Sequence, residues 1–190
     1  MRRTLTRAVA AVAIATQLAG CFPLVAVGVG ATLVVTDRRT MGAQLDDATI
    51  EAKLTTEAAS RFGEKAHVVV TSYNGVVLLT GEVPNEAARE AMGTLARGTE
   101  RVRSVENELV VGPASGFSER ADDTYITSLV KARFLEGKDL FAGAYVKVVT
   151  ERKVVYLMGL VKRPEADAAA QFAASTKGVV RVVKVFEYID

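Results

Sequence analysis

Apolar and polar residues alternate along two stretches of the chain that are similar to each other. Residues 68–83 read VVVTSYNGVVLLTGEV, and residues 146–161 read VKVVTERKVVYLMGLV. Each stretch holds two short runs rich in β-branched residues around a tight turn, which predicts an antiparallel β-hairpin. Asn74–Gly75 suits a two-residue turn, because both residues tolerate a positive φ. The chain therefore contains an internal repeat organised around two hairpins.

An isolated glycine interrupts the second strand of each predicted hairpin. A shift of 78 positions (159 − 81) lays Gly81 on Gly159, so this glycine is part of the repeat. A glycine inside a strand predicts a β-bulge, or a place where another segment packs closely.

A helical pattern precedes each hairpin. Apolar residues recur there at every fourth position, which predicts an amphipathic helix. These residues are Ile50, Leu54 and Ala58 in the first repeat and Ile126, Val130 and Phe134 in the second. The pairs Asp46–Asp47 and Asp122–Asp123 stand just before the two patterns, and we interpret them as helix N-caps.

A second helix and a third strand follow each hairpin. Pro84 and Pro164 suit the first turn of a helix. The expected Ala-rich helices cover residues 87–96 and 165–174, and the expected third strands cover residues 102–111 and 179–189. A strand that is joined to the next strand by a helix pairs with it in parallel.

These elements predict an α+β protein with two tandem αββαβ domains. Each domain is expected to be a small three-stranded mixed sheet covered by two helices. We place the domains at residues 46–112 and 122–190, with a linker at residues 113–121. The Gly/Pro-rich stretch 112–116 marks the joint between them.

The first residues have the layout of an export signal. Arg2, Arg3 and Arg7 make the first residues basic, residues 8–16 are mostly apolar, and residues 18–21 read LAGC. We predict a signal peptide at residues 1–20. The LAGC motif resembles a bacterial lipobox, which implies that Cys21 is lipidated, for example with palmitate. Residues 21–45 would then be the lipidated cysteine and its tether.

A transmembrane span over residues 8–35 is the alternative, although Gln17, Pro23 and several glycines interrupt that run. In bacterial lipoproteins the residue after the lipidated cysteine influences sorting. Phe22 differs from the Asp that retains such proteins in the inner membrane. The resemblance therefore implies a lipid-anchored protein of the outer membrane that faces the periplasm.

Charge is distributed unevenly between the repeats. The whole chain carries a net charge of +2, and loss of the three arginines of the signal would leave about −1 (2 − 3). The basic pI is therefore no sign of nucleic-acid binding. Residues 46–112 hold 7 basic and 11 acidic residues, and residues 122–190 hold 11 basic and 9 acidic residues. This polarisation favours different partners for the two repeats.

The sequence offers little to a catalytic or metal site. It has one His, His67, and one Cys, which excludes Cys/His metal clusters and His-based triads once Cys21 is lipidated. We interpret His67 as a solvated residue at the start of a strand. The recurrence of the aspartate pairs in both repeats favours capping over acid/base chemistry. We therefore predict no enzyme activity, no catalytic residue and no cofactor.

At this point the residues carry a resemblance to a known family. The doubled αββαβ unit, with DDTYIT at residues 122–127 and VYLMGLV at residues 155–161, resembles the BON domain. A lipobox, a short tether and two such repeats together resemble outer-membrane lipoproteins with two BON domains. The resemblance implies a non-enzymatic protein that binds anionic phospholipid through its second repeat and maintains outer-membrane integrity. Tyr125 stands where the family leads us to expect Trp, and Leu129 where we expect Lys.

The first helices of the two repeats differ in a way that points to the same function. A shift of 76 positions (125 − 49) pairs Thr49 with Tyr125, and the second copy is the more apolar and more basic of the two. At about 100° per residue, its non-core side forms a second face. We predict that the phospholipid-binding residues are Tyr125, Ser128, Leu129, Lys131, Ala132, Arg133 and Leu135. Alternatively, this face packs against the first domain or against Phe117.

The favoured function is binding of an anionic phospholipid membrane. The rival is a periplasmic adaptor that docks an envelope assembly machine through the acidic first domain, with lipid only as its anchor. The sequence leaves open the lipid headgroup, the protein partner, the oligomeric state and any clustering at division sites.

Overall fold

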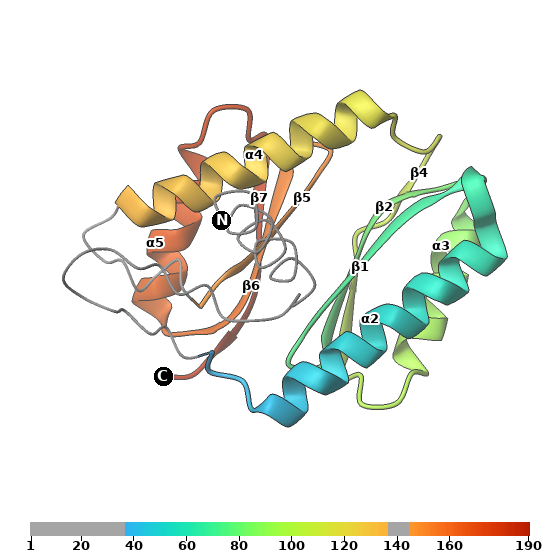
Figure 1. The fold of residues 1–190 in the computed structure, drawn as a ribbon, viewed down its shortest axis with the longest axis horizontal. Coiled ribbons are helices and arrows are strands. Elements are labelled where there is room, and N and C mark those ends of the chain that lie inside the picture. Colours follow the sequence, from blue (N-terminus) through green and yellow to red (C-terminus); the bar gives the residue numbers. More distant parts are fainter. Residues whose placement is uncertain (1–36, 137–144) are drawn as a thin grey trace, which may run out of the picture. The chain divides into compact units, whose positions relative to one another are not determined.

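The structure is a computed structural model that describes residues 37–136 and 145–190, except for the side chains of residues 135 and 136. Cys21, the predicted signal peptide and most of the predicted tether lie outside the described residues. The first repeat comprises α2 (Met41–Phe62), η2 (Gly63–Lys65), β1 (His67–Tyr73), β2 (Val76–Val83), α3 (Glu86–Arg97), β3 (Ser104–Asn107) and β4 (Val110–Val111). The second comprises α4 (Phe117–Glu136), β5 (Lys147–Glu151), β6 (Val154–Val161), α5 (Arg163–Ala174) and β7 (Arg181–Tyr188) (Figure 1).

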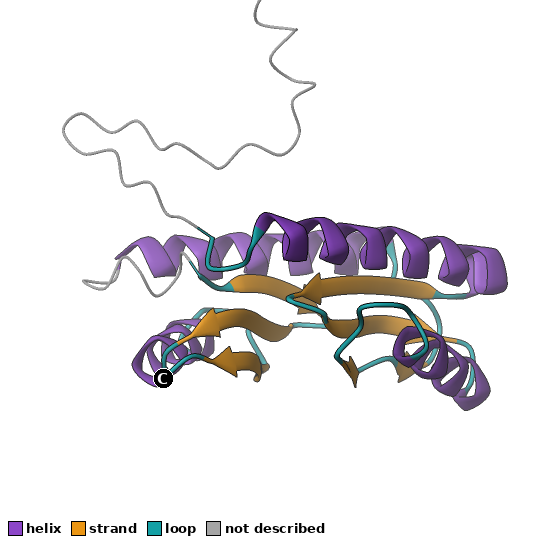
Figure 2. Ribbon diagram, turned by 90° about the horizontal axis from the view of Figure 1, so that it is seen from below, coloured by secondary structure: helices purple, strands orange, loops and turns teal. Residues whose placement is uncertain are grey.

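Each repeat forms its own mixed sheet, as predicted. In the first, β1 pairs antiparallel with β2, and β2 pairs in parallel with β3 and β4. In the second, β5 pairs antiparallel with β6, and β6 pairs in parallel with β7. The helices of each repeat pack against their own sheet (Figures 1 and 2). The predicted α+β fold with two αββαβ repeats is confirmed.

The third strand of the first repeat is split, whereas residues 102–111 were expected to form one strand. The side chain of Asn107 accepts a hydrogen bond from the Leu109 backbone N–H at 3.3 Å and donates one to the Arg89 carbonyl at 3.0 Å. Leu109 turns into the core of the repeat, where it is buried. The ladder therefore stops after Asn107 and resumes at Val110.

The hairpin turns have the backbone that the sequence predicts. Asn74 and Gly75 have φ angles of 52° and 76°, and Arg152 and Lys153 have φ angles of 52° and 62°. The pairing of β1 with β2 runs without a bulge from His67 to Tyr73. At Gly81 a Cβ atom would overlap the carbonyl oxygen of His67 on the paired strand. Gly81 therefore marks a close approach of two strands.

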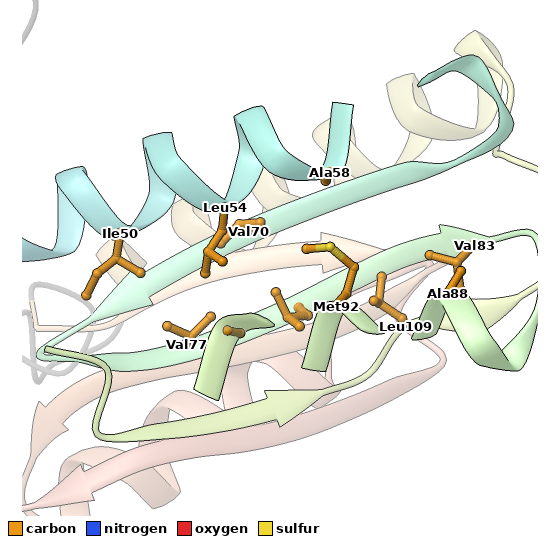
Figure 3. Close-up of a cluster of buried hydrophobic side chains, with 11 residues drawn as sticks. Ile50, Leu54, Ala58, Val70, Val77, Val83, Ala88, Met92 and Leu109 are labelled. Atoms are coloured by element: carbon orange, nitrogen blue, oxygen red, sulfur yellow. The ribbon is translucent and has the colours of Figure 1, made fainter. Parts of the chain in front are cut away.

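The predicted core positions are confirmed in both repeats. Ile50, Leu54 and Ala58 are buried against the first sheet and α3, as Figure 3 shows. Ile126, Val130 and Phe134 are buried against the second sheet and α5.

A third cluster joins the two sheets. Its buried members are Tyr73, Leu78, Tyr156, Met158 and Leu160. The neighbours of these residues along β2 and β6 point the other way, into the cores beneath the helices. Both strands therefore bury both of their faces, which explains why they read as continuous apolar runs.

Among the described residues, no helix combines the length and the apolar character that crossing a membrane requires.

Candidate functional site

The predicted lipid-binding face of α4 lies on the surface. Tyr125 is 65% exposed, and Ser128 and Ala132 are exposed beside it. Leu129 is half-buried at the edge of this face. Leu135 belongs to α4, but its side chain lies outside what the structure describes. The structure therefore brings Tyr125, Ser128, Leu129 and Ala132 together on one side of a helix.

The opposite side of α4 holds the helix firmly to its own repeat. Ile126, Val130 and Phe134 are at most 4% exposed. The ring of Phe134 meets that of Phe172 on α5 edge-to-face, with 6.4 Å between their centroids. The exposed face therefore lies on a helix whose opposite side is buried in the core, and it is open to solvent in this structure.

The alternative interpretation, in which this face packs against the first domain or against Phe117, is wrong. Tyr125 is exposed, and Phe117 is itself 84% exposed. Phe117 is the first residue of α4, because the helix begins inside the segment predicted as a linker. It lies two turns before Tyr125, on the same side as Ser128. The sequence analysis did not include Phe117 in the exposed face. Its spacing of eight residues from Tyr125, about two helical turns, could have indicated that both residues belong to one helix.

Basic side chains flank the exposed face. Lys131 and Arg133 are both exposed, one on each side of Ala132. Asp122 is exposed near the start of the same face, whereas Asp123 is buried. The C-terminal half of the described face is therefore the more basic half.

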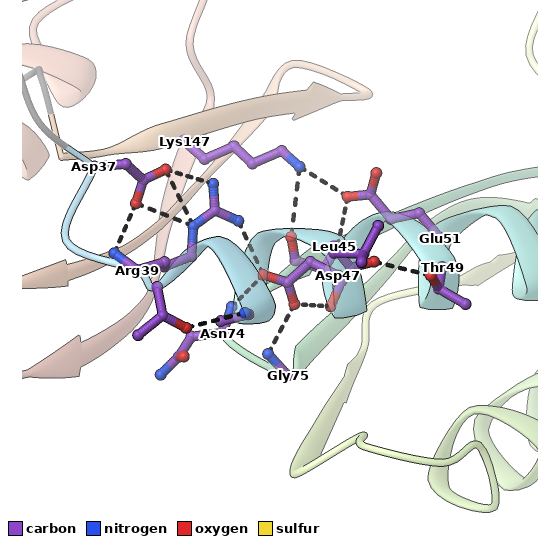
Figure 4. Close-up of polar contacts among 12 residues, drawn as sticks. Asp37, Arg39, Leu45, Asp47, Thr49, Glu51, Asn74, Gly75 and Lys147 are labelled. Atoms are coloured by element: carbon purple, nitrogen blue, oxygen red, sulfur yellow. Dashed lines mark hydrogen bonds and ion pairs between the residues drawn. The ribbon is translucent and has the colours of Figure 1, made fainter. Parts of the chain in front are cut away.

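The aspartates predicted as N-caps have another role. The N-cap of α2 is Thr40, whose side chain accepts a hydrogen bond from the backbone N–H of Ala43. Asp47 is buried in the second turn, where its carboxylate accepts hydrogen bonds from the backbone N–H groups of Asn74 and Gly75 at 2.7 and 2.8 Å (Figure 4). The capping prediction is thus wrong for Asp47.

Asp123 makes the equivalent contact in the second repeat. It is buried inside α4, and its carboxylate accepts 2.8 Å hydrogen bonds from the backbone N–H groups of Arg152 and Lys153. The recurring aspartate therefore fastens the first helix of each repeat to the turn of its hairpin. This contact is structural, because the carboxylates of both aspartates are occupied by hydrogen bonds from backbone N–H groups.

Ion pairs connect the two repeats. Basic residues of the second repeat meet acidic residues of the first in three places: Lys147 with Glu51 at 2.8 Å, Arg152 with Glu82 at 3.4 Å, and Arg181 with Glu108 at 3.2 Å. Glu82 is completely buried, and its other oxygen accepts a hydrogen bond from the Ser115 backbone N–H. Part of the charge polarisation therefore serves the contact between the repeats, in place of separate partners.

Another ion pair between the repeats has the opposite polarity, and a hydrogen bond from a neutral side chain accompanies it. Arg103 pairs with Glu187 at 2.8 Å, and Asn74 donates a hydrogen bond to the same carboxylate at 2.9 Å. Burial by itself would raise the pKa of Glu187, but these bonds lower it below its usual range.

His67 is largely buried, contrary to the expectation of a solvated residue. Its Nε2 atom lies 3.6 Å from the carboxylate of Glu151 on the other repeat. The nearby carboxylate of Glu151 raises the pKa of His67 above its ordinary value, against the opposing effect of burial. His67 is therefore part of the contact between the repeats.

The end of the predicted tether is also bound to the body. Arg38 makes a two-pronged ion pair with Glu165 at 2.6 and 2.7 Å and lies 3.6 Å from the ring centroid of Tyr145. Arg39 lies 4.0 Å from the ring centroid of Tyr73 and pairs with Asp47 at 2.9 Å (Figure 4). Of these two adjacent arginines, Arg38 therefore contacts the second repeat and Arg39 contacts the first. We call residues 37–39 the strap.

The described residues contain no candidate metal centre. Within residues 37–136 and 145–190, no three His, Cys, Asp or Glu side chains gather in a way that could hold a metal ion. Tyr156 lies between the sheets, where burial raises its pKa to about 12, so it stays protonated near neutral pH.

Both repeats match a known domain, and the chain as a whole is similar to known proteins. The BON domain matches residues 46–113 and 122–190. The chain is 40% identical to outer membrane lipoprotein DolP of Haemophilus influenzae, over 91% of each chain. It is 36% identical to the 21 kDa hemolysin of Actinobacillus pleuropneumoniae, over 81% of this chain and 80% of that one. It is 34% identical to osmotically-inducible protein Y of Escherichia coli, over 75% of this chain and 72% of that one.

Proposed function

The chain belongs to the BON domain family and is an outer membrane lipoprotein similar to DolP, and we propose that it binds anionic phospholipid through the exposed face of α4. In this proposal it catalyses no reaction. Lipid on Cys21 anchors the protein, and α4 makes the specific contact with the membrane that supports outer-membrane integrity.

The observation that carries the proposal is the exposure of Tyr125 on a helix whose other side is fixed in a core. An exposed aromatic residue with aliphatic neighbours and nearby cations is typical of a helix that lies in a membrane interface. Tyrosine suits this place because its ring is apolar while its hydroxyl stays hydrated.

The expected affinity of the face alone is modest. Each Lys or Arg near an anionic surface contributes about 1 kcal/mol, so Lys131 and Arg133 together supply about 2 kcal/mol. Apolar burial of Tyr125 adds to this at about 25 cal/mol per Å². A lipid anchor on Cys21 makes such weak binding sufficient, because it keeps α4 at a high effective concentration near the membrane.

Vesicle binding by the unlipidated protein tests the proposal. Residues 22–190 should bind vesicles that contain phosphatidylglycerol more strongly than vesicles of phosphatidylcholine alone. Tyr125→Ala should weaken this binding without lowering the melting temperature. Tyr188→Ala is the matched control, since Tyr188 is a half-exposed tyrosine at the end of β7. Equal binding by both variants would rule out the proposed face.

The anchor has its own test. Cys21→Ser in the full chain should stop lipidation, and should then either release the protein from membranes or stop its processing. Retention of the processed variant in the membrane fraction would show that another segment provides the anchor.

The adaptor function has lost part of its support. It rested on the acidic first repeat, and three of those acidic residues, Glu51, Glu82 and Glu108, bind basic residues of the second repeat. Lipid binding through α4 is therefore the function that the geometry supports best.

A further inference from the structure

The strap fixes the place where the lipid-bearing segment joins the folded body. Asp37 accepts hydrogen bonds from Arg39, while Arg38 and Arg39 contact different repeats. Residues 22–35 precede the strap and carry no charged side chain. The chain from Cys21 to Asp37 has 16 steps (37 − 21) and spans at most about 55 Å.

Two large apolar side chains stand exposed directly after the strap. Met41 is 87% exposed and Leu45 is 69% exposed. They lie one turn apart on α2, so they share a side of the helix. That side is opposite Ile50 and Leu54, which are buried in the core. Nothing in the first repeat requires two such residues at the surface.

The surroundings of Met41 and Leu45 carry little unbalanced negative charge. Residues 40–45 have no ionisable side chain. The three nearby acids all pair with arginines, two of them with the same one: Asp37 and Asp47 share Arg39, and Asp46 pairs with Arg101. The first turns of α2 can therefore approach an anionic surface without strong repulsion, although the first repeat as a whole is acidic.

We propose that Met41 and Leu45 form a second membrane contact, with the first turns of α2 entering the headgroup region of the leaflet that holds the lipid anchor. The membrane is the expected occupant because the uncharged segment 22–35 enters the body only a few residues before Met41. An apolar segment that is tied to a lipidated cysteine favours the interface, and the strap holds α2 beside its end. The inference extends the proposed function to the first repeat and does not depend on lipid binding by α4.

The contact ends after Leu45. Further along the same side of α2, Ala48, Ala52 and Thr56 border a shallow hollow of about 580 Å³. Alanine and threonine side chains are too short to insert among lipids as Met and Leu do. The structure thus assigns the apolar contact to one end of the helix, and the other end supplies its control.

The test places a fluorophore at single positions of the lipidated protein in vesicles of phosphatidylethanolamine and phosphatidylglycerol. Leu45→Cys and Thr56→Cys carry an environment-sensitive label in separate samples, because the lipidated Cys21 no longer has a free thiol. Position 56 is three turns after position 45 on the same exposed side of α2. Nitroxides on the lipid acyl chains should quench the label at position 45 severalfold more than the label at position 56, with a blue shift only at position 45.

Equal quenching at both positions, or none at position 45, would overturn the proposal. A blue shift at position 45 that grows with protein density and ignores lipid nitroxides would also overturn it, since a second copy of the chain would then cover α2. A label at Ser128→Cys reports on α4 separately. Quenching at position 128 without quenching at position 45 would support lipid binding by α4 and contradict the contact by α2. Quenching at position 45 without quenching at position 128 would support the contact by α2 and contradict lipid binding by α4.

Discussion

The buried carboxylate of Asp123 accepts 2.8 Å hydrogen bonds from the backbone N–H groups of both turn residues, Arg152 and Lys153. Both residues have positive φ angles, which residues other than glycine rarely adopt. A negative charge placed at two adjacent N–H groups stabilises a turn that the local sequence supports poorly. The first hairpin has Asn74–Gly75 and the same kind of contact from Asp47, so its turn is supported twice.

The first prediction follows from that contact. Asp123→Ala should lower the free energy of unfolding by about 2 to 4 kcal/mol, because two partly buried N–H groups lose a charged acceptor. Asp122→Ala is the control, since Asp122 is exposed on the same helix and should change stability by less than about 0.5 kcal/mol. Urea unfolding followed by circular dichroism measures both. Equal losses in the two variants would show that the contact of Asp123 with the turn adds no stability beyond that of an exposed aspartate.

The core face of α4 gives a second prediction. Val130 is completely buried, so Val130→Asp should place an unpaired charge in the core of the second repeat. The cost is comparable with the whole stability of a small domain, about 5 kcal/mol, and the variant should lose its cooperative melt. Lys131→Asp changes the next residue, which is exposed, and should melt close to the wild type. Native melting of Val130→Asp would contradict the observed packing.

Much of this fold was predictable from the sequence because its signals are local. Spacing of apolar residues placed Leu54 and Val130 in the cores, and Asn74–Gly75 placed a turn. The role of Asp47 was not predictable in this way. A carboxylate before an apolar pattern is typical of an N-cap, and its actual partners lie 27 and 28 residues away.

The strap and the contact between the sheets escaped sequence reasoning for a related reason. Arg38 lies in a segment without periodicity, and its partner Glu165 is 127 residues away. β6 did carry a signal, because a strand that is apolar on both faces must be covered on both faces. Phe117 was assigned to the linker because glycine and proline precede it, although α4 begins there.

The strap provides a third prediction. Arg38→Ala should destabilise the protein by about 1 to 3 kcal/mol, because it removes a two-pronged charged hydrogen bond and a stacked ring contact. The bond to Arg38 lowers the pKa of Glu165, so this stability is present above the ordinary glutamate pKa. The difference between wild type and variant should therefore shrink as the pH falls below about 4. Arg163→Ala is the control, since Arg163 stacks on Tyr188 at 4.7 Å but is exposed.

The contact of His67 with Glu151 predicts a dependence on pH. The nearby carboxylate of Glu151 raises the folded-state pKa of His67 above its ordinary value of 6.5; Glu82 also raises it, and Arg120 lowers it. Protonated His67 therefore stabilises the fold below about pH 6.5, and this contribution is lost as the pH rises through the folded-state pKa. His67→Gln should be less stable than the wild type at pH 5.5 and nearly equal to it at pH 9. An NMR titration of His67 with a pKa at or below 6.5 would contradict the assignment.

The last prediction concerns the cations beside the exposed face of α4. Lys131→Glu combined with Arg133→Glu should abolish most binding of the unlipidated protein to anionic vesicles, because two attractions of about 1 kcal/mol each become repulsions. Attraction to headgroups is screened over about 10 Å at 0.1 M salt, so binding of the wild type should also weaken as salt rises. Lys162→Glu combined with Lys177→Glu makes the same change in net charge at exposed lysines outside α4, one just before α5 and one in the turn after it. If that control loses binding equally, the membrane senses only net charge, and α4 is not the site. If neither double variant responds and salt has no effect, apolar contact through Tyr125 alone must carry the binding.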